Sequence, residues 1–407
     1  MKVCVVGGGG REHALAVVLG RTADVVVSPG NAGIPGSVAR PTEEIDADLY
    51  VIGPEAPLVD GLADRLRARG KLVFGPGADG ARLEGSKRWM KQVLVDAGVP
   101  TARHGVFTEL APAVEFLKSL PGPYVVKTDG LAAGKGVLVT ELLDEAAEDV
   151  AAKLSGSAFG EAGRTVVIEE GLVGPELSIL AVCDGRRAVP LAPAQDFKRV
   201  GDGGAGPNTG GMGAYSPVPM AGSEVVDAVM ERAVEPTLAT LRAQGIDYRG
   251  VLYAGLMLTA DGPKVLEYNV RFGDPEAQVV LPRISSDLVS LLAAAADGAL
   301  GDAPTFSEDA CVTVVLASDG YPASPRTGDV IEGIEDAEGV PGVTVFCAGV
   351  AGNGAGRLVT AGGRVLDVTA VGPTIGEART QAYAAVSRVS WPGIHHRSDI
   401  AAEAGNY

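Results

Sequence analysis

Cysteine and histidine are scarce in this sequence, and neither is arranged as a catalytic or metal-binding set. The four cysteines are scattered among 407 residues without a CxxC pair, and the four histidines lack HxxxH-type spacing. Isolated cysteines in apolar, strand-like segments are typical of core residues in a reducing cytosol. We therefore expect no disulfide and no zinc site. No Ser/His/Asp or Cys/His set for nucleophilic catalysis is apparent either.

Long apolar runs and an excess of positive charge are also missing. The longest helix-like apolar stretch, residues 288–296, is too short to span a bilayer, and residues 1–10 do not have the basic and apolar regions of a signal peptide. The net charge of −17 repels nucleic-acid phosphates. We expect a cytoplasmic monomer that binds small molecules, with no nucleic acid or membrane as a partner. Local Lys, Arg and backbone N–H groups must then hold any anionic ligand.

The apolar residues that are present suffice for several domains. Hydrophobic residues make up 46% of the chain, and its length predicts two to four domains. Residues 1–75 alternate strand-like and helical runs, which is the βαβ rhythm of a parallel, nucleotide-type sheet. We predict a multidomain α/β and α+β protein. Its expected parts are an N-terminal domain at 1–100, a central domain at 101–308 with a small β-rich lid at 121–187, and an α+β domain at 309–407.

One long segment, residues 190–219, is rich in glycine and proline and is predicted to be poor in regular structure. A loop of that length inside a compact protein is usually functional or disordered. Its mixture of Asp, Lys, Arg, Asn and Thr favours a functional loop.

A lysine inside a glycine-rich turn, YVVKTDGLAAGKGVLVT at 124–140, raises the question of phosphate binding. A Walker P-loop is excluded because Gly130 and Gly134 are one residue too close, Gly136 replaces the Ser or Thr after Lys135, and a strand rather than a helix follows. Two interpretations remain. The segment is a surface hairpin that contains lysine, or a flexible loop that folds over ATP phosphates with backbone N–H groups and lysines.

Two further patterns favour the ATP interpretation. The segment 165–178 is a strand that turns at Glu170 and continues as another strand, which is a hinge able to present backbone groups to adenine, with Glu176 near the ribose. Glu267 and Asn269 are two residues apart on a predicted strand, so both side chains lie on one face. Carboxylate and amide oxygens suit Mg²⁺.

Arg271 continues the row of Glu267 and Asn269 and could stabilise a transferring phosphoryl group. Taken in isolation, this row would more often be a solvated strand face. Downstream of a hinge and a Gly/Lys loop, we interpret it as a site.

The glycines at 7–10 follow a strand and suggest a dinucleotide fingerprint, but Glu12 or His13 stands where its third glycine should be. A dehydrogenase is therefore not expected. What remains is a phosphate-friendly loop at a helix N-terminus.

The order of these motifs resembles the ATP-grasp superfamily and, within it, the phosphoribosylamine–glycine ligase family, also called glycinamide ribonucleotide synthetases. The resemblance extends over nearly the whole chain, including the tail. It departs from the family pattern at Phe197 and Gly204, and the strand YAGLM at 253–257 carries no additional metal-binding carboxylate. The motifs that carry it are GGGGREHAL (7–15), GPEAPLVDG (53–61), LEGSK (83–87), KTDGLAAGKGV (127–137), GPNTGGMGAYSP (206–217) and EYNVRFGDPEAQ (267–278).

The resemblance implies an ATP-dependent ligation of glycine to phosphoribosylamine through an acyl phosphate, with ATP as co-substrate. It implies Mg²⁺ or Mn²⁺ on Glu267 and Asn269, and catalytic roles for Arg271, Lys127 and Lys135. The residues expected at ATP are Lys87, Lys127, Gly130, Gly134, Lys135, Gly136, Glu169, Glu170, Leu172 and Glu176. The residues expected at the other substrates are Gly8, Gly9, Gly10, Arg11, Glu12, Gly53, Pro54, Glu55, Asp196, Lys198, Arg199, Asn208, Thr209, Gly210, Gly211, Met212 and Asp274.

Two alternatives stay open at this point. One is another ATP-grasp carboxylate–amine ligase, such as a formate- or bicarbonate-using enzyme or a biotin carboxylase. The other is a catalytically silent nucleotide-binding module.

Overall fold

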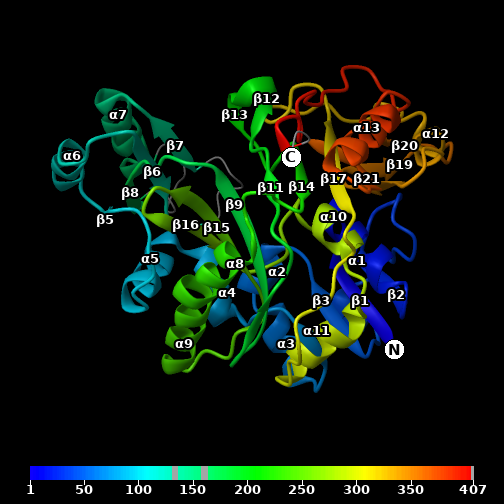
Figure 1. Ribbon diagram of the computed structural model, residues 1–407, viewed down its shortest axis with the longest axis horizontal. Coiled ribbons are helices and arrows are strands. Elements are labelled where there is room, and N and C mark those ends of the chain that lie inside the picture. The colour runs from blue at the N-terminus through cyan, green and yellow to red at the C-terminus, as the bar shows by residue number, and fades with distance from the viewer. Residues whose placement is uncertain (131–135, 157–163, 405–407) are drawn as a thin grey trace.

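The structure is a computed structural model that describes residues 1–130, 136–156 and 164–404. Its parts lie side by side in Figure 1: a small subdomain on the left, a central sheet, and a C-terminal sheet on the upper right, with the N-terminal sheet below. In the described residues no helix is long and apolar enough to cross a membrane.

The N-terminal part is a four-stranded sheet of order β2-β1-β3-β4 in which every pair is parallel. This confirms the predicted parallel sheet. Gly61 adopts a φ of +76° and separates two short helices in a region whose sequence is helical throughout. The elements are β1 (Lys2–Gly7), α1 (Gly10–Leu19), β2 (Asp24–Pro29), η1 (Thr42–Glu44), β3 (Leu49–Ile52), α2 (Glu55–Val59), α3 (Leu62–Ala68), β4 (Leu72–Phe74), α4 (Ala78–Gly85) and α5 (Lys87–Asp96).

The small subdomain is an antiparallel sheet of order β5-β8-β6-β7, packed against helices α6 and α7. It consists of β5 (His104–Phe107), α6 (Leu110–Lys118), β6 (Tyr124–Thr128), β7 (Val137–Thr140), α7 (Leu143–Leu154) and β8 (Val166–Glu170). The lid predicted at 121–187 differs at both ends. Strand β5 and helix α6 belong to this subdomain, whereas β9 (Glu176–Asp184) pairs with the central sheet.

The subdomain has a hydrophobic core of its own, separate from the core that runs through the rest of the molecule. A unit that shares few buried apolar contacts with its surroundings can move as a body. The residues of this core are Ala113, Leu117, Leu120, Val126, Ala146, Val150, Val166 and Ile168.

The central sheet has the order β10-β9-β15-β16. Strand β15 is mostly apolar and buried, Gly255 on it pairs with Glu267 on β16, and the register shifts at the next residue, where Leu266 of β16 has no partner on β15. The remaining central elements are β10 (Ala188–Pro190), α8 (Ser223–Val229), η4 (Met230–Val234), α9 (Glu235–Ala243), β15 (Arg249–Thr259), β16 (Gly262–Asn269), α10 (Ala277–Val280), η5 (Leu281–Arg283) and α11 (Leu288–Asp297).

The segment 190–219 is more regular than the sequence predicted. It forms β11 (Gln195–Asp196), β12 (Arg199–Gly201), η3 (Asp202–Gly204), β13 (Ala205–Asn208) and β14 (Gly213–Ser216). The expectation of little regular structure is wrong because two of its glycines, Gly203 and Gly204, form the tip of a β12–β13 ribbon, with φ of +66° and +73°.

The C-terminal sheet has the order β11-β14-β17-β21-β18, so two of its strands come from this segment. The tail therefore does not build its sheet alone, and the predicted boundary at 309 cuts through a sheet in space. Its own elements are β17 (Ala310–Ala317), α12 (Ile334–Glu338), β18 (Val343–Cys347), β19 (Val350–Gly352), β20 (Leu358–Thr360), β21 (Arg364–Gly372) and α13 (Ile375–Val386), which packs on β17 and β21.

Candidate active site

A carboxylate buried between two lysines lies where the small subdomain meets the central sheet. Oε2 of Glu169 on β8 is 2.9 Å from Nζ of Lys91 on α5, and its Oε1 is 2.9 Å from Nζ of Lys127 on β6. The side chains are 2%, 1% and 8% exposed, respectively. We call these three residues the lysine cluster. Burial alone raises the pKa of Glu169, but Lys127 and Lys91 outweigh burial and hold this pKa below its usual value.

The lysine cluster is tied to β16 at both ends. Nζ of Lys91 donates to Oγ1 of Thr101 (2.7 Å), which donates to the carbonyl of Val265 (2.6 Å). Nζ of Lys127 donates to the next carbonyl, that of Leu266 (3.1 Å). Its contact with the shared carboxylate is an ion pair without the alignment of a hydrogen bond. Since an ammonium has three donors, Lys127 keeps at least one N–H group that no other described residue accepts.

The sequence prediction missed Lys91, and it placed Glu169 among the residues at ATP without its two lysine partners. A usable signal exists, because Lys91 lies one helical turn after the predicted Lys87 on α5 and therefore on the same helix face. Burial, opposed by Glu169 and aided by Lys127, lowers the pKa of Lys91 to about 8.

Glu267 and Asn269 lie on β16 with the buried Tyr268 between them, so they share one face as predicted. The Glu267 carboxylate forms no hydrogen bond or ion pair with another described residue. Burial raises its pKa, but four surrounding cations outweigh burial and lower it. These cations are Lys198, Lys127, Lys87 and Arg271.

A divalent ion at this face would need ligands beyond the protein. The described residues contain no group of three or more His, Cys, Asp or Glu side chains that could hold a metal. An unpartnered carboxylate at Glu267 and an amide oxygen at Asn269 nevertheless fit Mg²⁺ or Mn²⁺, which commonly bind one or two protein oxygens together with phosphate oxygens.

Arg271 follows β16 and reaches back to the N-terminal part of the chain. Its Nη2 is 2.9 Å from Oε1 of Glu84 on α4 and its Nε is 3.3 Å from Oε2 of Glu55 on α2. Nη2 is also 3.4 Å from Oδ1 of Asn269, so the predicted row is continuous. The sequence prediction missed Glu84, whose other oxygen accepts from the N–H of Val270. The Arg271 guanidinium is therefore held by two carboxylates beside the Glu267 face.

The predicted hinge is the turn between β8 and β9. Oε1 of Glu170 accepts from the N–H of Arg103 (2.9 Å), and the N–H of Gly171 donates to the carbonyl of Pro123 (2.6 Å). The N–H of Leu172 donates to no other described residue. In this turn, Leu172 thus offers the backbone donor that the prediction requires.

The Gly/Lys loop is described in part. Nζ of Lys87 donates to the carbonyl of Gly130 (3.1 Å), and the carbonyl of Gly136 accepts from the last N–H of β6 (2.9 Å). The predicted residues Gly134 and Lys135 lie outside the described residues.

Lys198 joins two residues that were predicted to contact different ligands. Its Nζ is 2.9 and 2.8 Å from the two carboxylate oxygens of Asp196 and 3.2 Å from Oε2 of Glu176. Glu176, at the start of β9, therefore lies beside the long segment, so the proposed ribose and glycine regions are adjacent.

Two predicted residues of the long segment face each other on the β12–β13 ribbon. Arg199 pairs with Asn208, and Nη1 of Arg199 donates to the carbonyl of Gly206 on the same ribbon (2.7 Å). The ribbon thus uses the Arg199 side chain for its own structure.

The predicted substrate-binding residue Met212 is built into the fold. Its side chain is wholly buried, its N–H donates to the carbonyl of Phe197 (2.8 Å), and its carbonyl accepts from the N–H of Val315 (3.1 Å). The Met212 N–H is therefore used inside the fold, and its contact with a substrate stays a prediction.

The neighbouring turn is held by a residue from the tail. Arg364 on β21 donates from Nη1 to the carbonyls of Gly210 (2.6 Å) and Asp274 (2.8 Å) and lies 3.4 Å from that of Gly211. The hydroxyl of Thr209 accepts from the N–H of Gly211 (3.0 Å), which closes the turn.

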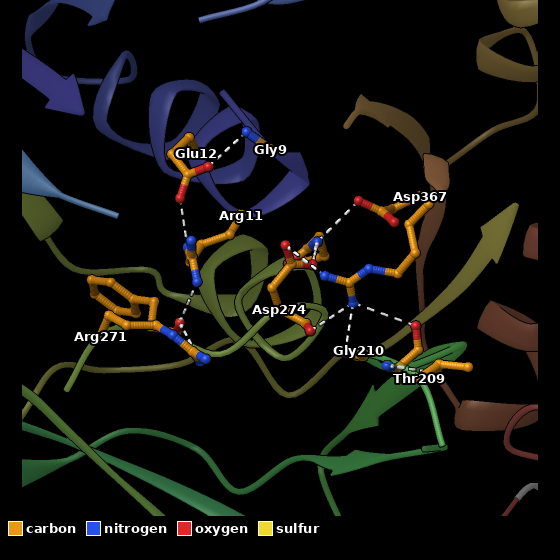
Figure 2. Close-up of polar contacts among 12 residues, drawn as sticks. Gly9, Arg11, Glu12, Thr209, Gly210, Arg271, Asp274 and Asp367 are labelled. Carbon is orange, nitrogen blue, oxygen red and sulfur yellow. Dashed lines mark hydrogen bonds and ion pairs between the residues drawn. The ribbon is translucent and has the colours of Figure 1, made fainter. Parts of the chain in front are cut away.

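Two carboxylates from different parts of the chain meet at one amide. Nε2 of Gln278 on α10 donates to Oδ1 of Asp274 (2.8 Å) and to Oδ2 of Asp367 on β21 (2.9 Å), while Arg364 pairs with Oδ2 of Asp274 (3.0 Å). We call these four residues the carboxylate cluster, and Figure 2 labels its two carboxylates, Asp274 and Asp367. Burial, followed by the charge of Asp274, raises the pKa of Asp367 to about 7.

Carboxylates also occupy the start of α1. Oε2 of Glu12 accepts from the N–H of Gly9 (2.6 Å) and Oε1 pairs with Arg11, as Figure 2 shows. A Cβ on Gly10 would overlap Oδ2 of Asp367. Acidic side chains therefore lie at the start of α1, and phosphate binding there stays a prediction.

The remaining predicted residues of this region shape the backbone. The carbonyl of Gly8 accepts from Nδ2 of Asn31 (2.8 Å), and the N–H of Gly53 donates to the carbonyl of Val6 (2.9 Å). Pro54 precedes the first residue of α2, Glu55, whose carboxylate faces Arg271.

Comparison with known proteins identifies the whole chain. The N, ATP-grasp (A) and C domains of phosphoribosylglycinamide synthetase match residues 1–84, 85–277 and 311–403. A Streptomyces coelicolor protein named phosphoribosylamine–glycine ligase is 49% identical, with 99% of both chains covered. A Mesorhizobium japonicum protein of the same name is 47% identical, with 98% of this chain and 97% of that protein covered.

The chain belongs to the phosphoribosylamine–glycine ligase family. Among solved structures, a phosphoribosylamine–glycine ligase from Thermotoga maritima matches with a TM-score of 0.84 and 37% identity, covering 98% of this chain and 100% of that one. A biotin carboxylase domain from Hydrogenobacter thermophilus matches with a TM-score of 0.71 and 17% identity, covering 97% of this chain and 91% of that one, and so shares the fold alone. As a member of an ATP-grasp ligase family, the protein is an ATP-consuming enzyme.

Proposed function

We propose that the protein joins glycine to 5-phosphoribosylamine with ATP, giving glycinamide ribonucleotide, ADP and phosphate. The observation that carries this is the unpartnered Glu267 carboxylate among four cations, next to Asn269. The surrounding cations offset the repulsion between this carboxylate and a triphosphate, so the site suits a triphosphate with a bound metal ion. The full-length similarity to ligases of this name supports the choice of substrates.

The chemistry needs an activated glycine. One oxygen of the glycine carboxylate attacks the γ-phosphorus, and ADP leaves with the bond electrons. The amine of phosphoribosylamine then attacks the carbonyl carbon of this glycyl phosphate, the C–O bond to phosphate breaks, and the nitrogen loses one proton. Because the intermediate hydrolyses readily, the site must exclude water, and closure of the small subdomain would do this.

Each charged group has a part in this scheme. Lys87 and Lys127, with Lys135 of the loop, hold phosphate oxygens, and Arg271 stabilises the charge that develops on the transferring group. Glu267 and Asn269 would hold Mg²⁺ or Mn²⁺, which when bound neutralises phosphate charge. The Leu172 N–H and the neighbouring hinge backbone contact adenine.

The amine-bearing substrates belong on the opposite side of this cationic region. Asp274, Asp196 and the turn at Thr209 to Gly211 hold glycine, and the carboxylates near α1 suit the hydroxyls and amine of the ribosyl substrate. The supporting observation is the carboxylate cluster, which has more negative than positive groups.

Several broader expectations accompany this proposal. The enzyme acts as a monomer in the cytoplasm, without nucleic acid or membrane, and its domains divide near residues 100 and 308, with β11 and β14 completing the C-terminal sheet from the central part. Support for a reducing compartment comes from the four cysteines, which are all free and buried.

The deciding assay measures ADP release with glycine and freshly generated phosphoribosylamine, each omitted in turn. Release that requires both substrates is the expected result. ADP release that is unaffected by omitting either one would rule out the proposed function.

A further inference from the structure

The lysine cluster holds one positive charge in excess, because two lysines share one carboxylate. A buried cation without a full counter-charge is costly unless an anion compensates it, and the neighbouring Glu267 carboxylate is shared with three further cations, Lys198, Lys87 and Arg271. Each lysine has two partners, but the Lys91 side chain is 1% exposed and the Lys127 side chain 8% exposed, so the excess charge is accessible at Lys127.

The geometry also fixes where that charge is presented. Lys127 donates to the carbonyl of Leu266, and Lys91 is connected through Thr101 to the carbonyl of Val265. These carbonyls directly precede Glu267 on β16. The cluster therefore holds Lys127 beside the face at which the triphosphate is proposed to bind.

We propose that Lys91 is a positioning residue that keeps Lys127 available to the ATP phosphates by sharing Glu169 with it. This inference rests on the proposed function, which puts ATP at this face. Without Lys91, the buried carboxylate would have Lys127 as its only partner, and the two would form a closed, neutral pair. The loss would be specific to phosphate, because Lys91 lies on α5 and not in the β8–β9 turn proposed for adenine.

A charge-matched pair of variants tests this. Lys91→Met leaves Glu169 paired with Lys127 alone and the cluster neutral. Lys91→Met combined with Glu169→Gln leaves Lys127 as the one charge and restores the single positive excess of the native cluster. Lys153→Met is the control, because Lys153 is another buried lysine but pairs with Asp149 one turn earlier on α7.

The measurement is isothermal titration of the full chain with Mg²⁺ and a non-hydrolysable ATP analogue, and separately with adenosine. We expect Lys91→Met to bind the analogue about tenfold or more weakly, and the double variant to regain most of that affinity. The affinity for adenosine should change by less than about threefold in every variant. Lys153→Met should bind both ligands like the native protein.

Several outcomes would overturn the inference. One is that Lys91→Met binds the analogue with unchanged affinity. Another is that Lys91→Met loses affinity for the analogue and for adenosine equally. If Lys91→Met does not fold, the double variant decides, because it has no carboxylate at position 169 to lose a partner: binding within about threefold of native supports the inference, and weakening beyond about tenfold overturns it. A native protein that does not bind the analogue would overturn the proposed function itself, whereas a native protein that binds it and an unaffected variant would overturn only the role of Lys91.

Discussion

The lysine cluster and the carboxylate cluster are opposite solutions to burying charge. In the first, Lys91 and Lys127 share the carboxylate of Glu169 and one positive charge remains. In the second, Asp274 and Asp367 share the amide of Gln278 and one arginine, Arg364, and one negative charge remains when both are ionised. Each cluster is thus complementary to a ligand group of the opposite sign.

The two clusters also differ in the pKa shifts of their buried carboxylates. Lysine and carboxylate of the first compensate each other, so Glu169 has a lowered pKa and stays ionised. In the second, burial and a like charge raise the pKa of Asp367 to about 7, so this group can become neutral instead. We infer that a ligand anion completes the first cluster, whereas a proton can complete the second.

The largest expected effect is at the cationic side of this comparison. Glu267→Gln removes the acidic group that the cations beside the lysine cluster surround. We expect kcat to fall by about 10³-fold or more, because the glutamine cannot offer a charged metal ligand. Steady-state ADP release checks this, with Asp261→Asn as control at the exposed β15–β16 turn. A near-normal rate at ordinary Mg²⁺ would remove Glu267 from the metal site.

The next effect concerns the carboxylate cluster. Arg364→Met removes the donor to the Gly210 and Asp274 carbonyls and the counter-charge of Asp274. We expect kcat/KM for glycine to fall about 10- to 100-fold, with little change in KM for ATP. Arg357→Met, an exposed arginine in the turn between β19 and β20, is the control. Equal losses for glycine and ATP would contradict the separation of the two clusters.

Much of the fold was predictable because it depends on local patterns. The parallel order of β1 to β4 follows from alternating apolar and helical runs, and the shared face of Glu267 and Asn269 follows from the two-residue period of a strand. The hinge at Glu170 was visible as two strands joined by a glycine turn. In each case, neighbours in sequence are also neighbours in space.

What could not be predicted depends on contacts between distant segments. Asp367 meets Gln278 only because β21 lies beside α10, and no local pattern in the tail shows this. Lys91 looks like any lysine of an amphipathic helix until Glu169 is placed against it. The burial of Met212 also depends on other segments, since its backbone partners are Phe197, between β11 and β12, and Val315 on β17.

The third prediction concerns the stability of the protein and tests the packing around the carboxylate cluster. Gly10→Ala places a methyl group against Oδ2 of Asp367, at the point where α1 meets the carboxylate cluster. We expect a loss of about 2 kcal/mol in the free energy of unfolding, because a buried carboxylate cannot yield freely. Denaturant unfolding measures it, with Gly301→Ala, whose Cβ would meet nothing within 4 Å, as control. Equal stability of the two variants would show that Asp367 can move away.

The smallest effect tests whether a proton completes the carboxylate cluster. Folding raises the pKa of Asp367 from 3.8 to about 7, so its protonated form is the stable one in the native state. Its stabilising contribution is complete below the unfolded value and is lost as the pH rises towards 7. Asp367→Asn cannot ionise, so we expect it to be more stable than the native protein at pH 8, by about 1 kcal/mol, with the gain shrinking as the pH falls to 4. Thermal unfolding across this range measures the difference, and Asp329→Asn serves as a carboxylate control in the same part of the chain. A gain that stays constant with pH would mean that Asp367 is charged throughout, and that Arg364 alone offsets both carboxylates.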